Sequence, residues 1–247
     1  MSCILNIETS TSVCSVALSM DGEVLFAKAS FDGPSHAALL GVFVEEALSV
    51  LKKKGKKALD AVAVSSGPGS YTGLRIGVSV AKGLCFGFGI PLIGIHTLDI
   101  MAATVNSKGD SQIVSITDDC LYCAMLDARR MEVYAAIYDA SLKPVRETKA
   151  DIVEAGTYAS YLEKGKVCFF GNGASKCKSV ITSPNAIFIE DIHPLAVNMI
   201  PLSEQAFAAG KFEDTAYFEP FWILVNSFIK LTLLCRRPAV SMMTTSA

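Results

Sequence analysis

A glycine-rich turn between an apolar strand and a helix carries the strongest chemical signal in this sequence. It spans residues 65–77, reads SSGPGSYTGLRIG, and directly follows the apolar residues 61–64. A tight turn that leads from a strand into a helix can aim backbone N–H groups at an anion such as a phosphate. The same geometry lets another stretch of backbone approach closely. A phosphate-facing turn and a tight strand-to-helix corner therefore both remain open.

The turn matches neither of the common phosphate-binding motifs. A Walker A sequence needs G-x-x-x-x-G-K-[ST], but counting from Gly67 puts Thr72 at the second glycine, and no lysine follows. A dinucleotide-binding sequence needs G-x-G-x-x-G, but after Gly67 and Gly69 the next glycine comes one position late. A nucleotide bound by another fold would be contacted by residues from two loops, namely Thr9, Ser10, Gly67, Gly69 and Ser70.

Residues suited to acid–base or metal chemistry are few. The three histidines are at positions 36, 96 and 193. His36 begins a predicted helix, but Leu40 stands where a second metal-binding histidine would lie one turn later. Glu8 ends the first predicted strand, and a lone carboxylate there is typical of a hydrogen-bonded structural residue. No pair of residues suits general acid–base catalysis, so we expect neither a catalytic residue nor a metal site.

The composition is that of a compact protein with large cores. Of 247 residues, 51% are hydrophobic and 19% are charged, and 22 basic against 24 acidic side chains give a net charge of −2. Proteins that bind nucleic acid alone usually carry a basic excess, so a partner would have to supply that charge. The N-terminus does not resemble a secretory signal. The apolar residues 222–235 are too few and too polar to predict a membrane span.

Cysteine usage predicts a cytoplasmic protein with buried thiols. The eight cysteines show no repeated spacing. Cys120 and Cys123 form a single C-x-x-C inside a predicted strand, where residues three apart point to opposite faces. That arrangement suits neither a zinc site nor a disulfide.

The periodicity of apolar residues predicts two lobes, each with strands and helices. We expect the first lobe at residues 1–106 and the second at 107–221, divided by the polar residues 106–111, and an atypical tail at 222–247. The first lobe has predicted strands at 3–8, 13–20, 23–30, 60–65 and 92–94 and helices at 35–54, 72–88 and 97–105. The second has predicted strands at 112–117, 121–127, 133–138, 167–170 and 186–190 and helices at 151–164, from 174, and at 194–209.

Small residues form a ridge along the helix predicted at 72–88. Gly73, Gly77, Ala81 and Cys85 repeat every four residues. Glycine in a helix interior costs about 1 kcal/mol relative to alanine, so the ridge implies a very close contact, within the lobe or with another subunit. The wide apolar face of the helix at 35–54 favours a subunit contact. The predicted interface comprises Leu39, Leu40, Phe43, Val44, Gly73, Leu74, Ile76, Gly77, Val80 and Ala81.

The sequence resembles the TsaB family of bacterial tRNA threonylcarbamoyladenosine biosynthesis proteins. The matching stretches are ILNIETST at 4–11, Ser35-His36 at a helix start, VSSGPGSYTGLRIG at 64–77, GIHTL at 94–98 and AYFEP at 216–220. The block at 67–77 is highly specific. The resemblance ends near Phe221, because the family usually finishes with a short polar tail.

This resemblance implies an α/β protein with the two-lobe, actin-like and sugar-kinase-like ATPase fold, which is ribonuclease H-like and has mixed sheets. It implies a non-catalytic relative of TsaD, the glycoprotease-like subunit that holds a metal and transfers the threonylcarbamoyl group to the tRNA adenosine beside the anticodon. Metal binding of the TsaD type needs a histidine pair, which this chain lacks.

The resemblance also implies partners. These are a TsaD homologue bound as a heterodimer through the first two helices, the TsaE ATPase docked on that pair, and tRNA reached indirectly. Family members also self-associate through the same surface. No cofactor is expected for this chain, and ATP or ADP is expected only at the complex. The alternatives are a small-molecule kinase or ATPase of the same fold, and an inactive glycoprotease-like peptidase homologue.

Overall fold

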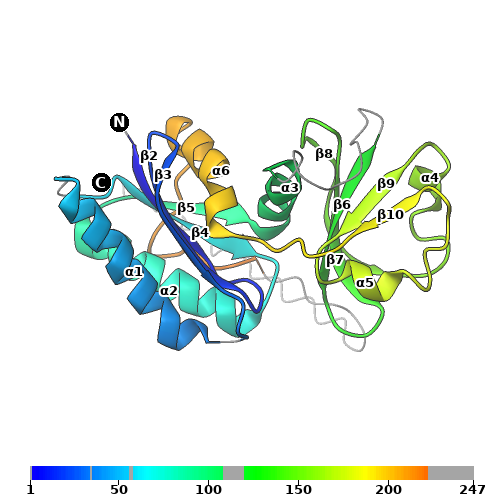
Figure 1. Ribbon diagram of the computed structural model, residues 1–247, viewed down its shortest axis with the longest axis horizontal. Coiled ribbons are helices and arrows are strands. Elements are labelled where there is room, and N and C mark those ends of the chain that lie inside the picture. The colour runs from blue at the N-terminus through cyan, green and yellow to red at the C-terminus, as the bar shows by residue number, and fades with distance from the viewer. Residues whose placement is uncertain (1, 34, 56–57, 108–119, 222–247) are drawn as a thin grey trace, which may run out of the picture.

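The computed structural model describes residues 2–33, 35–55, 58–107 and 120–221, which form two lobes (Figure 1). The first lobe contains β1 (Cys3–Glu8), β2 (Cys14–Met20), β3 (Glu23–Ser30), α1 (His36–Lys53), β4 (Ala61–Gly67), α2 (Tyr71–Phe88), β5 (Leu92–His96) and α3 (Thr97–Ser107). The second contains β6 (Leu121–Asp127), β7 (Glu132–Tyr138), β8 (Pro144–Ile152), α4 (Ala159–Leu162), β9 (Val167–Phe170), α5 (Ala174–Cys177) and β10 (Ala186–Ile189). The final helix is α6 (Ala196–Ala208).

The two sheets repeat one topology. The first has the strand order β3-β2-β1-β4-β5, and the second, read from β8, has the order β8-β7-β6-β9-β10. In each sheet, three antiparallel strands come first, and two strands parallel to the first one follow. The fold is therefore the two-lobe, actin-like and sugar-kinase-like arrangement with mixed sheets.

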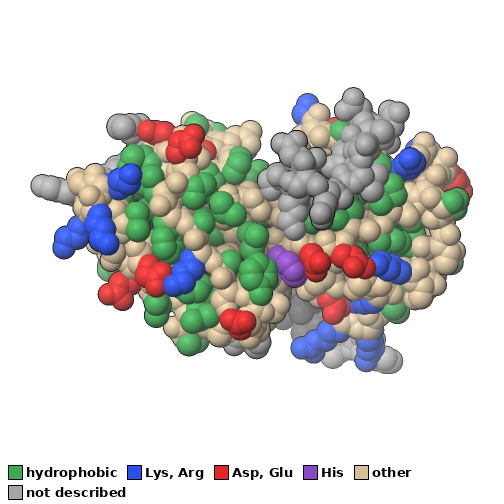
Figure 2. Space-filling view, in the orientation of Figure 1, with side chains coloured by type: hydrophobic (Ala, Val, Ile, Leu, Met, Phe, Trp, Pro, Cys, Tyr) green, Lys and Arg blue, Asp and Glu red, His purple; other side chains and the backbone are tan. Residues whose placement is uncertain are grey.

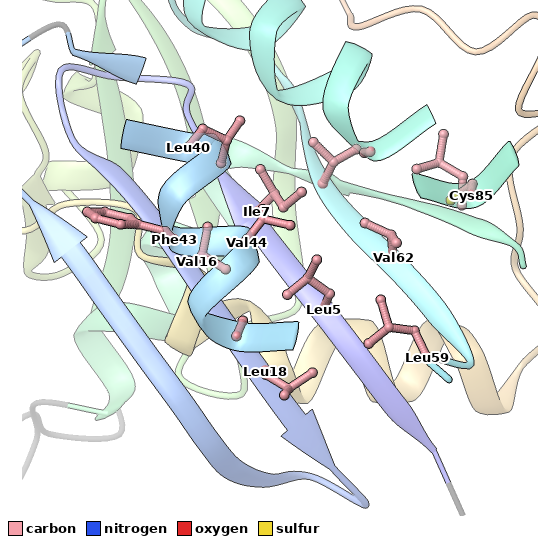
Figure 3. Packing of buried hydrophobic residues seen from close by; sticks show 14 of the residues in the cluster. Leu5, Ile7, Val16, Leu18, Leu40, Phe43, Val44, Leu59, Val62 and Cys85 are labelled. Atoms are coloured by element: carbon pink, nitrogen blue, oxygen red, sulfur yellow. The ribbon is translucent and has the colours of Figure 1, made fainter. Parts of the chain in front are cut away.

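Helices cover both faces of the first sheet because its central strands are apolar on both sides. Leu5 and Ile7 of β1 face α1 and α2, whereas Ile4 faces α3 and α6. Figure 3 shows Leu40, Phe43 and Val44 of α1 packed against β1 and β2. Each fully buried side chain of this size contributes about 1.5–3 kcal/mol to folding. This packing fixes α1 and α2 side by side on one face of the sheet (Figure 1).

Helix α6 follows the second sheet in sequence but packs against the first. Its buried Met199 joins Ile4 in one apolar cluster. The carboxylate of Glu204 accepts hydrogen bonds from the Ser2 hydroxyl at 2.5 Å and from the Ser19 hydroxyl at 3.1 Å. The first lobe is therefore not built from one continuous range of residues.

Most predicted elements agree with the structure to within one or two residues, but the helix predicted at 151–164 is wrong over most of its length. Strand β8, which the sequence did not predict, extends to Ile152, and only Ala159–Leu162 are helical. Arg146 Nη2 lies 2.6 Å from both carboxylate oxygens of Asp151, and the Tyr158 hydroxyl donates to the same carboxylate at 2.7 Å. This network and the pairing with β7 override the local helical pattern. The strand predicted at 112–117 and the tail lie outside the described residues.

The seven described cysteines are buried and free. Cys120 and Cys123 face apolar clusters on opposite sides of the second sheet, which confirms that prediction. Burial raises the pKa of the Cys14 and Cys85 thiols to about 11, so both remain protonated at neutral pH. Of the described helices, none has the length and apolar character needed to cross a membrane.

Candidate functional site

The glycine-rich turn meets the loop after β1 at one edge of the first sheet. Strands β1 and β4 are parallel neighbours, so their carboxyl ends lie at the same edge. The Ser70 N–H donates to the Ser10 carbonyl at 2.6 Å, and the Thr9 hydroxyl donates to the Gly73 carbonyl at 2.8 Å. The structure thus brings Thr9 and Ser10 together with the turn. The two loops bond directly to each other.

The glycines of the turn are required by this contact. A Cβ atom on Gly69 would overlap the Ser10 carbonyl oxygen, and one on Gly73 would overlap that of Thr9. A Cβ on Gly67, which has φ +98°, would lie 2.7 Å from the carbonyl oxygen of Phe221. The close approach is therefore made to the chain's own backbone. This geometry favours the tight strand-to-helix corner over the phosphate-facing turn.

The small-residue ridge of α2 lies inside its own lobe. Gly73, Gly77, Ala81 and Cys85 are all buried, and Gly77 faces the side chain of Thr9. The prediction that this ridge contacts another subunit is therefore wrong, because the loop after β1 already occupies the space that the glycines leave.

The other residues of the predicted interface divide into two groups by their burial. Those in the core of the first lobe are Leu40, Phe43, Val44 and Leu74. Those that are half-buried at its margin are Leu39, Ile76 and Val80. An interface on α1 and α2 would therefore have to use other residues for its centre.

A second row of small residues on α2 faces outward and is not among the residues predicted from the sequence. Ser79, Gly83 and Gly87 repeat every four residues and are exposed. A Cβ on Gly83 or Gly87 would have no neighbouring atom within 4 Å in the described part of the chain. With Phe86 and three of the exposed residues of α1, this row forms what we call the outer face, which comprises Ala38, Gly41, Val42, Ser79, Gly83, Phe86 and Gly87. The same four-residue repeat could have revealed it.

Glu8 ends β1 beneath the corner and is fully buried. The Ser10 N–H donates to its Oε1 at 2.5 Å, whereas Oε2 has no hydrogen-bond partner among the described residues. Burial raises the pKa of the Glu8 carboxyl to about 7, although the nearby Ser10 and Ser65 hydroxyls and the Ser10 N–H act in the opposite direction. The predicted hydrogen bond to this carboxyl is confirmed, and its structural role stays a prediction.

His36 begins α1 in a buried position beside the corner. Its Nε2 lies 2.8 Å from the Thr11 carbonyl, so this nitrogen donates a hydrogen bond there. Leu40, one turn later, is buried in the core. Within residues 2–107 and 120–221, excluding positions 34, 56 and 57, no three His, Cys, Asp or Glu side chains are placed to hold a metal ion.

A cavity of about 360 Å³ lies between the lobes. Polar groups from both lobes line it, and one pair bridges them, because the Tyr138 hydroxyl donates to Asp99 Oδ1 at 2.6 Å. Burial, followed by the nearby Asp99 carboxylate, raises the pKa of Tyr138, so this hydroxyl keeps its proton. None of the five residues predicted to contact a nucleotide is among the described residues that line this cavity.

Comparisons with known proteins match this chain to the TsaD family model and to proteins named TsaB. The family model described as TsaD, tRNA N6-adenosine threonylcarbamoyltransferase, matches residues 32–184. The tRNA threonylcarbamoyladenosine biosynthesis protein TsaB of Escherichia coli (strain K12) is 31% identical over 234 residues, which is 90% of this chain and 95% of that protein. The TsaB protein of Bacillus subtilis (strain 168) is 28% identical over 181 residues, covering 72% of this chain and 74% of the relative.

A solved structure confirms the fold. YeaZ from Pseudomonas aeruginosa has a TM-score of 0.72 at 24% identity, and the match covers 90% of this chain and 100% of that one. The E. coli relative matches along almost its whole length, and its level of identity is sufficient to assign the family. The chain belongs to the TsaB family of tRNA threonylcarbamoyladenosine biosynthesis proteins.

Proposed function

We propose that this chain is a non-catalytic subunit of the machinery that makes threonylcarbamoyladenosine in tRNA. It binds a TsaD-type transferase through the outer face of α1 and α2, and the transferase then modifies the adenosine beside the anticodon. The TsaE ATPase docks on that pair. The sealed Glu8 and the apolar Leu40 beside His36 support assigning the chemistry to the partner.

The open glycines of the outer face are the observation that carries this proposal. Each exposed glycine in a helix interior costs about 1 kcal/mol relative to alanine. Among the described residues, Gly41, Gly83 and Gly87 have no neighbouring atom within 4 Å of a would-be Cβ, so no contact in that part of the chain offsets the cost. A partner helix that packs closely against this surface offers the compensating contact. Phe86, with 89% of its surface exposed, would be buried by the same partner.

A TsaD-type partner suits this surface because it is a relative of this chain. The TsaD family model covers residues 32–184, which include both α1 and α2. Two related lobes can place their equivalent helix pairs face to face, so that four helices pack together. A second copy of this chain would use the same surface, which makes self-association a competitor of the heterodimer.

Figure 2 shows apolar side chains among charged ones on the visible face of the first lobe.

Gly83→Glu is expected to abolish co-purification with the cognate TsaD homologue without impairing folding. The new side chain enters open space, and glutamate is the better helix former by about 0.5–1 kcal/mol, so the chain should be at least as stable. The carboxylate would, however, occupy the position of the partner helix. Pull-down of the tagged chain measures association, and thermal melting measures stability.

The matched control is Gly156→Glu, which adds the same side chain at another glycine with no atom within 4 Å. This variant lies in the second lobe and should retain the partner. If Gly83→Glu binds the TsaD homologue as well as the wild type does, the proposed interface is wrong.

A further inference from the structure

We propose that the turn joining β6 to β7 is a phosphate-binding site that contacts the backbone of tRNA. Arg129 and Arg130 are exposed in this turn, which lies beside α5 in the second lobe (Figure 1). Figure 2 shows Lys and Arg side chains gathered at this edge of the lobe. The identification of the ligand as tRNA rests on the proposed function, whereas the affinity of the two guanidinium groups for phosphate does not.

Both arginines adopt a backbone conformation that long side chains rarely take. Their φ angles are 70° and 44°, in the left-handed region where glycine, asparagine and aspartate are the usual residues. Residues in such conformations persist when their surroundings hold them there, and they concentrate at functional sites. The turn thus carries two arginines at positions where glycine, asparagine or aspartate would adopt the backbone conformation at a lower energetic cost.

Lys176 of α5 stabilises this conformation of the turn through contacts with its backbone and with Asp127. Its ammonium group pairs with the Asp127 carboxylate and donates to the carbonyls of Arg130 at 2.8 Å and Glu132 at 2.6 Å. The same carboxylate accepts the Arg129 N–H at 2.9 Å. The turn is therefore shaped before any ligand arrives, which lowers the entropic cost of binding.

The tight turn at residues 171–173 places α5 against the end of β6. Asn172 Oδ1 accepts the Asp127 N–H at 3.0 Å. A Cβ on Gly173 would lie 2.8 Å from the backbone carbon of Leu126, so only glycine lets the two segments lie this close. Lys176, three residues after Gly173, is thereby placed within hydrogen-bond distance of the turn that carries the arginines.

The arginine side chains are not paired with the carboxylate that begins the turn. Lys176 pairs with Asp127 instead. Among the residues that the structure describes, neither guanidinium group has a hydrogen-bond or ion-pair partner. Guanidinium groups bind phosphate through paired hydrogen bonds, and two of them on successive residues suit neighbouring phosphates of one strand.

A folded RNA fits this site better than an acidic peptide does. Phosphates line the outer surface of an RNA, where a convex turn can reach them without entering a groove. An extended peptide would instead need a groove or a free strand edge. The net charge of −2 is consistent with a site that adds two contacts to a larger surface shared with the partner.

The test is the salt dependence of tRNA binding in the Arg129→Asn/Arg130→Asn variant. Asparagine removes both charges and tolerates the backbone conformation. Binding of an unmodified tRNA transcript is measured by fluorescence anisotropy with the full chain bound to its TsaD homologue, and with the full chain alone. The slope of log K against log salt should fall in magnitude by about 1.4 to 1.8, because each lost phosphate contact contributes about 0.7 to 0.9. Each single variant should lose half of that.

The matched control is Lys164→Asn/Lys166→Asn, which removes two exposed positive charges from the same lobe. Its slope should remain that of the wild type. The arginine double variant should melt at the wild-type temperature or above, because asparagine suits the left-handed conformation better. A weaker slope at an unchanged or higher melting temperature therefore reports lost binding and not lost folding.

An unchanged slope in an intact complex overturns this inference and leaves the proposed function standing. Failure of the wild-type chain to bind the TsaD homologue contradicts the proposed function instead, and the titration of the chain alone then tests the turn. This inference is also overturned if tRNA binds neither to the wild-type chain in complex with its TsaD homologue nor to the wild-type chain alone. Calorimetry with inorganic pyrophosphate separates the sources of phosphate. If the variant loses pyrophosphate binding while its tRNA slope is unchanged, the site takes a small anion and the RNA assignment is wrong.

Discussion

Gly73→Ala is expected to destabilise the chain by about 3 kcal/mol, whereas Gly83→Ala in the same helix is expected to stabilise it by about 1 kcal/mol. Helix propensity favours alanine equally at both positions. At Gly73, however, the new Cβ would overlap the carbonyl oxygen of Thr9, while at Gly83 it would have no atom of the described residues within 4 Å. Urea unfolding of the two variants measures the difference.

Gly77→Ala provides an intermediate case for the same contact. Its Cβ would overlap only the Thr9 hydroxyl, which can rotate away by giving up its 2.8 Å hydrogen bond to the Gly73 carbonyl. The loss should therefore be smaller than at Gly73, where backbone must move. Equal stability of the Gly73→Ala and Gly83→Ala variants would show that α2 does not lie against the loop after β1 in the way described.

The wild-type chain is expected to lose stability as the pH rises because Glu8 ionises, and the Glu8→Gln variant is expected not to show this loss. The pKa of this carboxyl is about 7 in the folded chain against an ordinary value of 4.5. The contribution of the Glu8 carboxyl to the free energy of unfolding is therefore fully present below pH 4.5 and is lost as the pH rises through 7. The loss arises because this carboxyl ionises more readily in the unfolded chain than in the folded chain, where it is buried. The total loss is about 3 kcal/mol.

The measurement is the unfolding free energy at about pH 5 and about pH 8.5 for the wild type and for Glu8→Gln. The amide keeps an oxygen to accept the Ser10 N–H, so the local geometry should persist. The difference in stability between the two pH values should shrink by about 2.5 kcal/mol in the variant, because part of the loss has already occurred at pH 5. Glu154→Gln, which removes a carboxyl on the surface, is the control. An identical pH profile for wild type and Glu8→Gln would show that the Glu8 carboxyl is not desolvated.

Local periodicity predicted most elements because their patterns agree with the tertiary packing. The alternation in β1 and the four-residue repeats of α1 and α2 each place apolar residues on the faces that the sheet buries. The helix predicted for residues 151–164 was wrong because residues distant in the sequence determine the secondary structure of this segment. Strand β8 exists because it pairs with β7 and because Arg146 bonds to Asp151, and neither contact is visible in a local pattern.

The candidate site shows the same division. The glycine-rich sequence alone indicated a close backbone approach on α2, and the structure contains one, between Gly73 and Thr9. The sequence also contains both small-residue rows of that helix, 73-77-81 and 79-83-87. Only the tertiary structure decided that the first row is sealed and the second is open. A helical repeat states which residues share a face, whereas the packing of neighbouring elements determines which face meets the sheet and which is left for a partner.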